Sequence, residues 1–296
     1  MRVTRVFMAL LSLGLSVGSP AQDAFGPQAV PVAARSFRLG TMKLTSLHDA
    51  QYVVPNDGKT FGVDAGAAAV GELLRAHGEA TDRITLSVNS LLVRDGARTL
   101  LIDTGLGPKA HGELMPGLQA AGVSPGSVTD VLITHSHGDH VGGLVDANGR
   151  LAFPKAKIRM AAKEWDWFKT QGDAALIKTI TPQVHTFEPG ARIAPGIRSI
   201  ALDGHTPGHV GYEITSGRDR LLDIGDLAHS SIVSLAKPGW TLGFDWAAEL
   251  AKATRMTTIA MLAKNQELIY SPHFPYPGVG RIDAEGDAFA WKAGVP

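Results

Sequence analysis

The sequence contains no cysteine among its 296 residues. This absence excludes disulfide bonds, thiolate metal ligands and a cysteine nucleophile, so any bound metal must be held by imidazole and carboxylate groups. The sequence also lacks a charge imbalance, because Lys and Arg together number 28 and Asp and Glu together number 28. This balance gives no indication of a nucleic acid or an anionic membrane surface as a partner.

A hydrophobic run long enough to cross a membrane is also lacking near the N-terminus. The apolar run at residues 6–17 has twelve residues, whereas a spanning helix needs about 20. It follows Arg2 and Arg5 and precedes small residues, which is the order of a secretory signal. We expect residues 1–21 to be a cleaved signal peptide, with a retained anchor as the alternative. Residues 22–296 are then expected to form one domain of a periplasmic or secreted protein without a membrane span.

What the sequence does contain is a series of apolar, strand-like segments that alternate with helical patterns. Residues 85–105 predict a hairpin whose turn is Asp95-Gly96. Residues 244–265 form the longest helical pattern, with Asp245 as its expected N-cap. Because hairpins dominate, the pattern predicts mixed sheets covered by helices rather than a doubly wound parallel sheet.

The feature that points to function is the stretch VLITHSHGDHVGG. In it His135, His137, Asp139 and His140 form an H-x-H-x-D-H pattern, directly after an apolar run that predicts a buried strand. On an extended segment residues two apart point the same way, so His135 and His137 can hold one metal. A turn into a helix at Gly138 would direct the other two side chains towards a second metal. A polar loop that happens to be rich in histidine is the alternative.

Three further side chains of metal-ligand type follow apolar strands in the same way. They are His205, Asp226 and His273. Rigid strand ends are good places to hold a metal, and four strand ends meeting at one edge of a sandwich would form one cleft. Taken alone, Asp226 could belong to an ordinary Gly-Asp turn, and His273 could be a structural histidine between prolines.

This set of residues resembles the metallo-β-lactamase superfamily. The stretches HTPGH and HFPYPGVGRI are most similar to its methyl parathion hydrolase-like branch, which includes lactonases that act on acyl-homoserine lactones. The resemblance covers almost the whole mature chain and implies an α+β fold, a four-layer αβ/βα sandwich of two mixed sheets flanked by helices. It also implies the metal ligands: His135, His137 and His205 for the first metal, Asp139, His140 and His273 for the second, and Asp226 as a bridge between the two.

These ligand types imply hydrolytic chemistry with two divalent cations. Cations about 3.5–4 Å apart can share a water and lower its pKa towards neutrality, and one of them can polarise a carbonyl or phosphoryl oxygen. Zinc is the expected metal, and manganese, cobalt and iron suit the same ligands. The catalytic candidates are the bridging Asp226 and Asp139, which could steer the shared hydroxide or accept its proton.

We therefore expect a binuclear metal-dependent hydrolase whose metal-bridging hydroxide opens a lactone or cleaves an ester. The alternative is a phosphotriesterase or arylesterase of methyl parathion hydrolase type. A β-lactamase is less favoured, since superfamily members with that activity lack an aspartate where Asp226 stands. A glyoxalase-type thioesterase and a non-catalytic metal-binding protein are also less favoured. The expected partner is a small-molecule lactone, ester or phosphotriester, and the oligomeric state is left open between a monomer and a homodimer.

Other residues could support or line such a site. By the resemblance Asp103 would hydrogen-bond the ligand histidines, and an ordinary strand-ending turn is the alternative. His209 could support the ligands and His229 could line the pocket mouth. The remaining histidines are expected at the surface or packed away from the metals: His48, His77, His111 and His185. Some aromatic residues could line an acyl or aryl pocket or belong to the core: residues 165–168 and 238–246, Phe274 and Tyr276.

Overall fold

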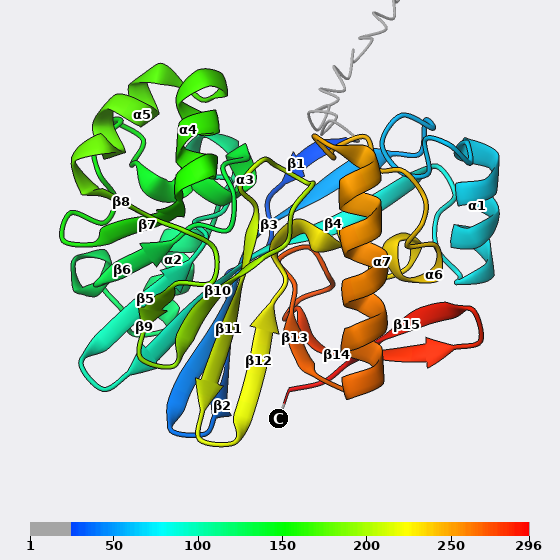
Figure 1. The fold of residues 1–296 in the computed structure, drawn as a ribbon. Coiled ribbons are helices and arrows are strands. Elements are labelled where there is room, and N and C mark those ends of the chain that lie inside the picture. The colour runs from blue at the N-terminus through cyan, green and yellow to red at the C-terminus, as the bar shows by residue number, and fades with distance from the viewer. Residues whose placement is uncertain (1–24, 296) are drawn as a thin grey trace, which may run out of the picture.

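The computed structural model describes residues 25–295, so the signal peptide predicted at residues 1–21 lies outside the described residues. Two β-sheets pack face to face, and helices cover the outer face of each sheet (Figure 1). This arrangement confirms the predicted α+β sandwich of two mixed sheets flanked by helices. Among residues 25–295, no helix has the length and apolar character that membrane crossing requires.

The first sheet has eight strands in the order β1-β3-β4-β5-β6-β7-β8, and β2 also pairs with the long β3. Pairing is antiparallel from β1 to β5 and parallel from β5 to β8. The predicted hairpin is confirmed as β4 and β5. The strands are β1 (Gly26–Gln28), β2 (Ala33–Leu39), β3 (Met42–Pro55), β4 (Arg83–Asp95), β5 (Arg98–Ile102), β6 (Asp130–Leu132), β7 (Lys157–Ala161) and β8 (Val184–Phe187).

The second sheet has seven strands in the order β15-β14-β13-β12-β11-β10-β9. Only the β12–β13 pair is parallel, and the other pairs are antiparallel. The strands are β9 (Arg192–Ala194), β10 (Ile197–Ala201), β11 (Val210–Ser216), β12 (Asp219–Asp223), β13 (Leu268–Tyr270), β14 (Val279–Glu285) and β15 (Ala288–Ala293).

The helices lie on the outside of the two sheets, with α4 and α5 beside the first sheet and α7 against β14 of the second (Figure 1). The α-helices are α1 (Ala67–Ala76), α2 (Leu114–Ala120), α3 (Gly138–Val141), α4 (Ala162–Gln171), α5 (Ala174–Ile180), α6 (Val233–Ala236) and α7 (Ala248–Asn265). Short 3-10 helices are η1 (Pro108–Ala110), η2 (Pro125–Ser127), η3 (Gly142–Leu144), η4 (Thr181–Gln183) and η5 (Gly225–Leu227).

The predicted N-cap of the longest helix is wrong. Helix α7 begins at Ala248, with Ala247 at the cap position. The Asp245 carboxylate is drawn away from the helix by two stronger partners, because it lies 3.1 Å from His205 Nδ1 and 3.1 Å from an Arg255 guanidinium nitrogen. A buried carboxylate gains more from these charge-assisted contacts than from a backbone N–H.

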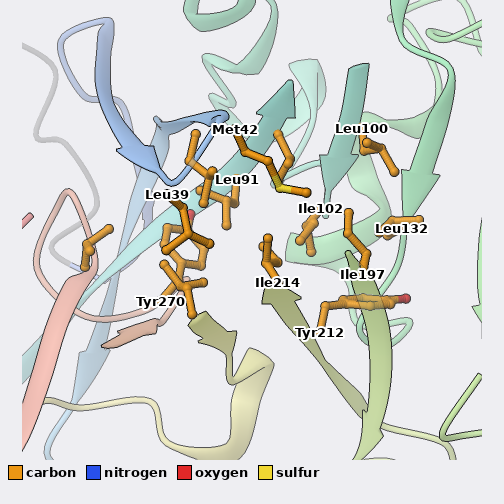
Figure 2. Packing of buried hydrophobic residues seen from close by; sticks show 14 of the residues in the cluster. Leu39, Met42, Leu91, Leu100, Ile102, Leu132, Ile197, Tyr212, Ile214 and Tyr270 are labelled. Atoms are coloured by element: carbon orange, nitrogen blue, oxygen red, sulfur yellow. The ribbon is translucent and has the colours of Figure 1, made fainter. Parts of the chain in front are cut away.

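The main core fills the space between the two sheets. Figure 2 shows Leu91, Ile102 and Leu132 of the first sheet facing Tyr212 and Ile214 of the second. Separate clusters of apolar side chains lie between each sheet and its covering helices. Burial on both faces holds each sheet rigidly, and this rigidity carries over to the residues at the strand ends.

Candidate metal centre

The strand ends that carry the candidate ligands meet at one edge of the sandwich. Strand β6 leads into the loop that holds His135 and His137, and α3 begins at Gly138, where the sequence predicted a turn into a helix. The other three strand ends contribute one candidate each: His205 after β10, Asp226 within η5 after β12, and His273 after β13.

The first group of candidate ligand atoms belongs to His135, His137, His205 and Asp226, and these atoms lie within 4.8 Å of one another. His137 Nδ1 lies 3.1 Å from His135 Nε2 and 3.0 Å from His205 Nε2. Burial lowers the pKa of His137 to about 4 and the pKa of His135 well below its usual value. These two rings are therefore neutral at pH 7, which is the form of imidazole that binds a metal.

The second group belongs to Asp139, His140 and His273, whose ligand atoms also lie within 4.8 Å of one another. The Asp139 carboxylate oxygen Oδ2 lies 3.7 Å from His140 Nε2 and 3.5 Å from His273 Nε2. The two groups have the same composition as the two ligand sets that the resemblance implies.

Asp226 stands between the two groups. One of its oxygens, Oδ2, lies 3.4 Å from His205 Nε2 and 3.2 Å from His273 Nε2, while Oδ1 lies 3.2 Å from His140 Nε2. Although burial opposes ionisation, the imidazoles of His273 and His140 hold the pKa of Asp226 well below its usual range. The side chain is thus a carboxylate that reaches both groups, as a bridging ligand must.

Asp226 Oδ1 and His140 Nε2 are both buried, and although they lie 3.2 Å apart, neither has a hydrogen-bond partner among residues 25–295. A buried polar atom without a partner is rare in native proteins and signals an ion or water at the site. A donor set of imidazole nitrogens and carboxylate oxygens suits zinc and also manganese, cobalt and iron. The residues present therefore fit two divalent metal ions, and the assignment of each ligand to its metal stays a prediction.

Asp103 supports the second group by contacting His140. Its carboxylate accepts hydrogen bonds from the backbone N–H (2.9 Å) and the hydroxyl (2.7 Å) of Thr134, and Oδ2 lies 2.8 Å from His140 Nδ1. The backbone of Asp103 has a positive φ of 57°, which is uncommon for a residue other than glycine. Of the two alternatives left open by the sequence, the structure favours support of a ligand histidine.

The His209 ring supports Asp226 by binding the backbone N–H of Asp226. Its Nδ1 lies 2.8 Å from the carbonyl of Leu202, and its Nε2 accepts a hydrogen bond from the Asp226 N–H at 3.0 Å. Because the same ring must donate at Nδ1 and accept at Nε2, it is neutral, and burial accordingly lowers the pKa of His209 to about 3. This residue fixes the position of the bridging candidate.

Sequence reasoning missed the group that supports His205. The Asp245 carboxylate contacts His205 Nδ1 on one side and the fully buried guanidinium of Arg255 on the other. Metal-binding histidines usually donate their second ring N–H to such a carboxylate. Asp245 and Arg255 lie about 40 and 50 residues after His205, so local spacing gave no signal for the contact.

His229 lines the cavity above the candidate ligands, in keeping with the sequence prediction, and it also reaches the ligands themselves. The ring is buried, and its Nε2 lies 3.0 Å from Asp226 Oδ2. It stacks between His273, with ring planes 7° apart, and Phe244, with ring planes 29° apart. Its ligand atom also lies within 4.8 Å of those of Asp226 and His273, so His229 is a further residue of the centre.

The remaining histidines lie outside these ligand groups, as expected. His77, His111 and His185 are exposed, and His48 is buried where it stacks on Tyr276. The aromatic candidates lie partly in the core, partly at the cavity and partly at the surface, where Trp246 is 61% exposed. Trp165, Phe168 and Phe274 belong to the core, whereas Phe244 lines the cavity at the metal centre.

A cavity of about 410 Å³ opens over the candidate ligands. Its apolar walls come from Tyr52, Leu86, Leu106 and Phe244, and its floor includes Asp139 and Asp226. No lysine or arginine of the described residues lines it. The arrangement can thus place an uncharged, partly apolar molecule against two metal ions.

Comparison with known proteins agrees with this geometry. A family model described as "Metallo-beta-lactamase superfamily" matches residues 83–273, from β4 to the last candidate ligand. The solved structure of AidC, a dizinc quorum-quenching lactonase in complex with a product, is 26% identical with a TM-score of 0.83, and the match covers 90% of this chain and 98% of that chain. The hydrolase AbOPH of the beta lactamase superfamily is 27% identical with a TM-score of 0.80, over 90% and 98% of the two chains.

A curated relative, metallo-beta-lactamase domain-containing protein 1 of Xenopus laevis, is 32% identical over 127 residues. That match covers 43% of this chain and 46% of the relative's length. The family model, in contrast, spans well over half of the chain and includes all seven predicted ligands. The chain therefore belongs to the metallo-beta-lactamase superfamily.

Proposed function

We propose that the chain is a hydrolase that uses two divalent metal ions, most simply zinc, to open a lactone or cleave an ester. The observation that carries the proposal is the position of Asp226, whose two oxygens reach both ligand groups on the floor of an apolar cavity. Structural metal sites are usually closed, whereas this one opens onto a space for substrate. The similarity to AidC, a dizinc lactonase, supports zinc and the lactone class.

When bound, the two cations supply a Lewis acid for the carbonyl oxygen and bring the pKa of a water towards neutrality. The chain's own residues supply the rest. Tyr52, Leu86 and Phe244 hold the apolar part of the substrate and exclude bulk water. Asp139 lines the cavity with its side chain 24% exposed, so a carboxylate oxygen that binds no metal could accept the proton that the attacking water releases.

The lining of the cavity also bears on the other activities. A β-lactam antibiotic or a glutathione thioester carries a carboxylate, and no lysine or arginine among the described lining residues could bind it. The aromatic walls formed by Tyr52 and Phe244 suit a compact aryl group equally well. A phosphotriesterase or arylesterase is therefore the second candidate.

The experiment that separates the candidates is proton release in a pH-stat at fixed substrate. The chain from Gln22, loaded separately with zinc and with manganese, is given a long-chain acyl-homoserine lactone and, in parallel, an aryl phosphotriester. Fast lactone opening that disappears in Asp226→Ala supports the proposal. Phosphotriester cleavage without lactone opening would replace it with the second candidate.

A further inference from the structure

A buried carboxylate outside the predicted ligand set lies beside the metal centre. Glu164 occupies the first turn of α4, and its side chain is completely buried. None of the cationic side chains described in residues 25–295 forms an ion pair with it. A buried negative charge without a cation is unfavourable unless its hydrogen bonds and surroundings compensate it.

Glu164 accepts four hydrogen bonds. Oε1 accepts one from the backbone N–H of Ser136 at 2.8 Å and one from its hydroxyl at 2.6 Å. Oε2 accepts one from the hydroxyl of Thr206 at 2.7 Å and one from the backbone N–H of Gly208 at 3.0 Å. Each oxygen accepts one of these bonds from a backbone N–H, which can only donate, so a proton on either oxygen would face at least one donor. The site is therefore built for an ionised carboxylate, which is an acceptor only.

These four donors belong to the two loops that carry the first ligand group. Ser136 lies between His135 and His137, and Thr206 directly follows His205. The second loop also sits directly on α4, because a Cβ added at Gly208 would lie 2.3 Å from the backbone nitrogen of Glu164. One carboxylate thus ties together the loops that present three imidazoles to the first metal.

The second ligand group is held by different residues. Asp103 lies 2.8 Å from His140 Nδ1, and the carbonyl of Ser87 lies 2.8 Å from His273 Nδ1. Neither of these contacts involves Glu164. A change at Glu164 should therefore affect one metal site and spare the other.

We propose that Glu164 is a positioning residue for the first metal, because its carboxylate fixes the two loops that carry His135, His137 and His205. The inference rests on the proposed two-metal function. The charge acts in the same direction as the hydrogen bonds, since a buried anion near the centre attracts a divalent cation. Supporting residues of this kind typically change metal affinity by about 10–100-fold.

The test is Glu164→Gln in the full chain, which keeps the shape of the side chain but removes its charge and turns one acceptor into a donor. Asp166→Asn is the matched control, because Asp166 lies on the exposed side of the same helix. Metal-free proteins are titrated with cobalt(II), and the visible absorption of the bound ion and the number of ions retained are recorded. His205→Ala and His273→Ala give reference spectra for loss of each ligand group.

We expect the wild type and Asp166→Asn to bind two cobalt ions. Glu164→Gln should bind one of them about 10–100-fold more weakly, with a spectrum that approaches that of His205→Ala. Two sites of unchanged affinity in Glu164→Gln, or equal weakening of both, would overturn the inference while leaving the proposed function standing. A wild type that binds no cobalt would overturn both.

If circular dichroism shows that Glu164→Gln does not fold, a milder variant tests the inference instead. Ser136→Ala combined with Thr206→Val removes two of the four hydrogen bonds and leaves the carboxylate in place. Selective weakening of the first cobalt site by several-fold supports the assignment, and unchanged affinity at that site overturns it.

Discussion

Asp226 connects the two ligand groups, since its oxygens lie within 3.4 Å of imidazole nitrogens from each group. We predict that Asp226→Asn lowers lactone hydrolysis by at least about 100-fold, because the variant loses the charge that a bridging ligand supplies. The chain should also retain fewer than two metal ions after dialysis, as counted by mass spectrometry.

Asp223 provides the control for this prediction. It lies three residues before Asp226, and burial raises the pKa of its carboxyl well above the usual value. Burial thus disfavours a charge on this group, and Asp223→Asn removes the ionisable carboxyl while keeping the acceptor for the Gly225 N–H. Equal loss of metal in both variants would show that the region is merely fragile and would contradict a specific role for Asp226.

The sequence predicted the positions of the candidate ligands because they follow the ends of apolar strands within a few residues. It also suggested Asp103 and His209 as supporting residues, but it could not predict the others. Glu164, Asp245 and Arg255 lie on helices or loops distant in the sequence. They contact a ligand, or a residue beside one, only after the sheets have packed. Such contacts depend on tertiary structure and have no local pattern.

At the level of elements, the centre depends on how closely the loop at residues 205–209 approaches α4. We predict that Gly208→Ala lowers the free energy of unfolding by about 1–3 kcal/mol, because its Cβ would overlap the backbone of Glu164. The first metal should bind more weakly as well. Urea denaturation and metal titration provide the measurements.

Gly126→Ala is the matched control for this substitution. Gly126 also has an ordinary backbone conformation, and nothing lies within 4 Å of the added Cβ. It should therefore leave both stability and metal binding almost unchanged. If Gly208→Ala behaves in the same way, the packing of the loop against α4 is looser than the structure describes.

The loop between β5 and α2 also shapes the site, because it carries Leu106 into the cavity wall. Asp49 in β3 anchors it, because its carboxylate accepts hydrogen bonds from the backbone N–H groups of Leu106 and Leu114, both at 2.8 Å. Burial raises the pKa of Asp49 from 3.8 to about 6, although these two hydrogen bonds oppose the shift.

The raised pKa of Asp49 makes the folded state less stable as the pH rises. The folded pKa lies above the unfolded value, so the folded state binds the proton more tightly, and the contribution is complete below about pH 4 and lost as the pH rises through about 6. Relative to Asp49→Asn, which does not titrate there, the wild type should lose about 2 kcal/mol of unfolding free energy between pH 4 and 7. Urea denaturation of both proteins with a chelator present tests this, and parallel pH curves would contradict it.

The elements themselves were predictable to different degrees. The β4–β5 hairpin follows from its Asp95-Gly96 turn, and α7 follows from its long helical composition. The start of α7 was mispredicted because Asp245 has a tertiary partner that a local capping rule does not consider. Local signals therefore give the existence of an element more reliably than its boundary.

For the whole molecule, the metal centre concentrates buried carboxylates that have histidines around them but no lysine or arginine partner within residues 25–295. Asp103, Asp226 and Glu164 are all buried around the histidines. Bound metals would neutralise this charge and stabilise only the folded state, by about 4 kcal/mol when their concentration is 1,000 times Kd. We predict that removal of metal by a chelator lowers the Tm by on the order of 10 °C.

Differential scanning calorimetry measures this change, and zinc should restore the original Tm. Asp226→Asn serves as the control, because it should show a smaller difference between the chelated and the zinc-loaded states. A wild-type Tm that does not respond to chelator or zinc would mean that the cluster is a metal-free polar network.

The whole architecture follows from the sequence only in outline. Hairpins and helical patterns predict a layered α+β sandwich, and its presence is confirmed. The parallel pairs β5–β6 and β12–β13, which place strands from distant segments side by side, have no local signal. These pairs help to bring the ligand-bearing strand ends to one edge of the sandwich.

The most direct test of the central claim is a titration of metal-free chain with zinc while lactone opening is followed in a pH-stat. Each addition is a stated number of zinc equivalents per chain, and the substrate is a long-chain acyl-homoserine lactone. We predict that the rate rises to a plateau at two equivalents. A plateau at one equivalent would contradict the two-metal centre, and no lactone opening at any zinc content would contradict the proposed activity.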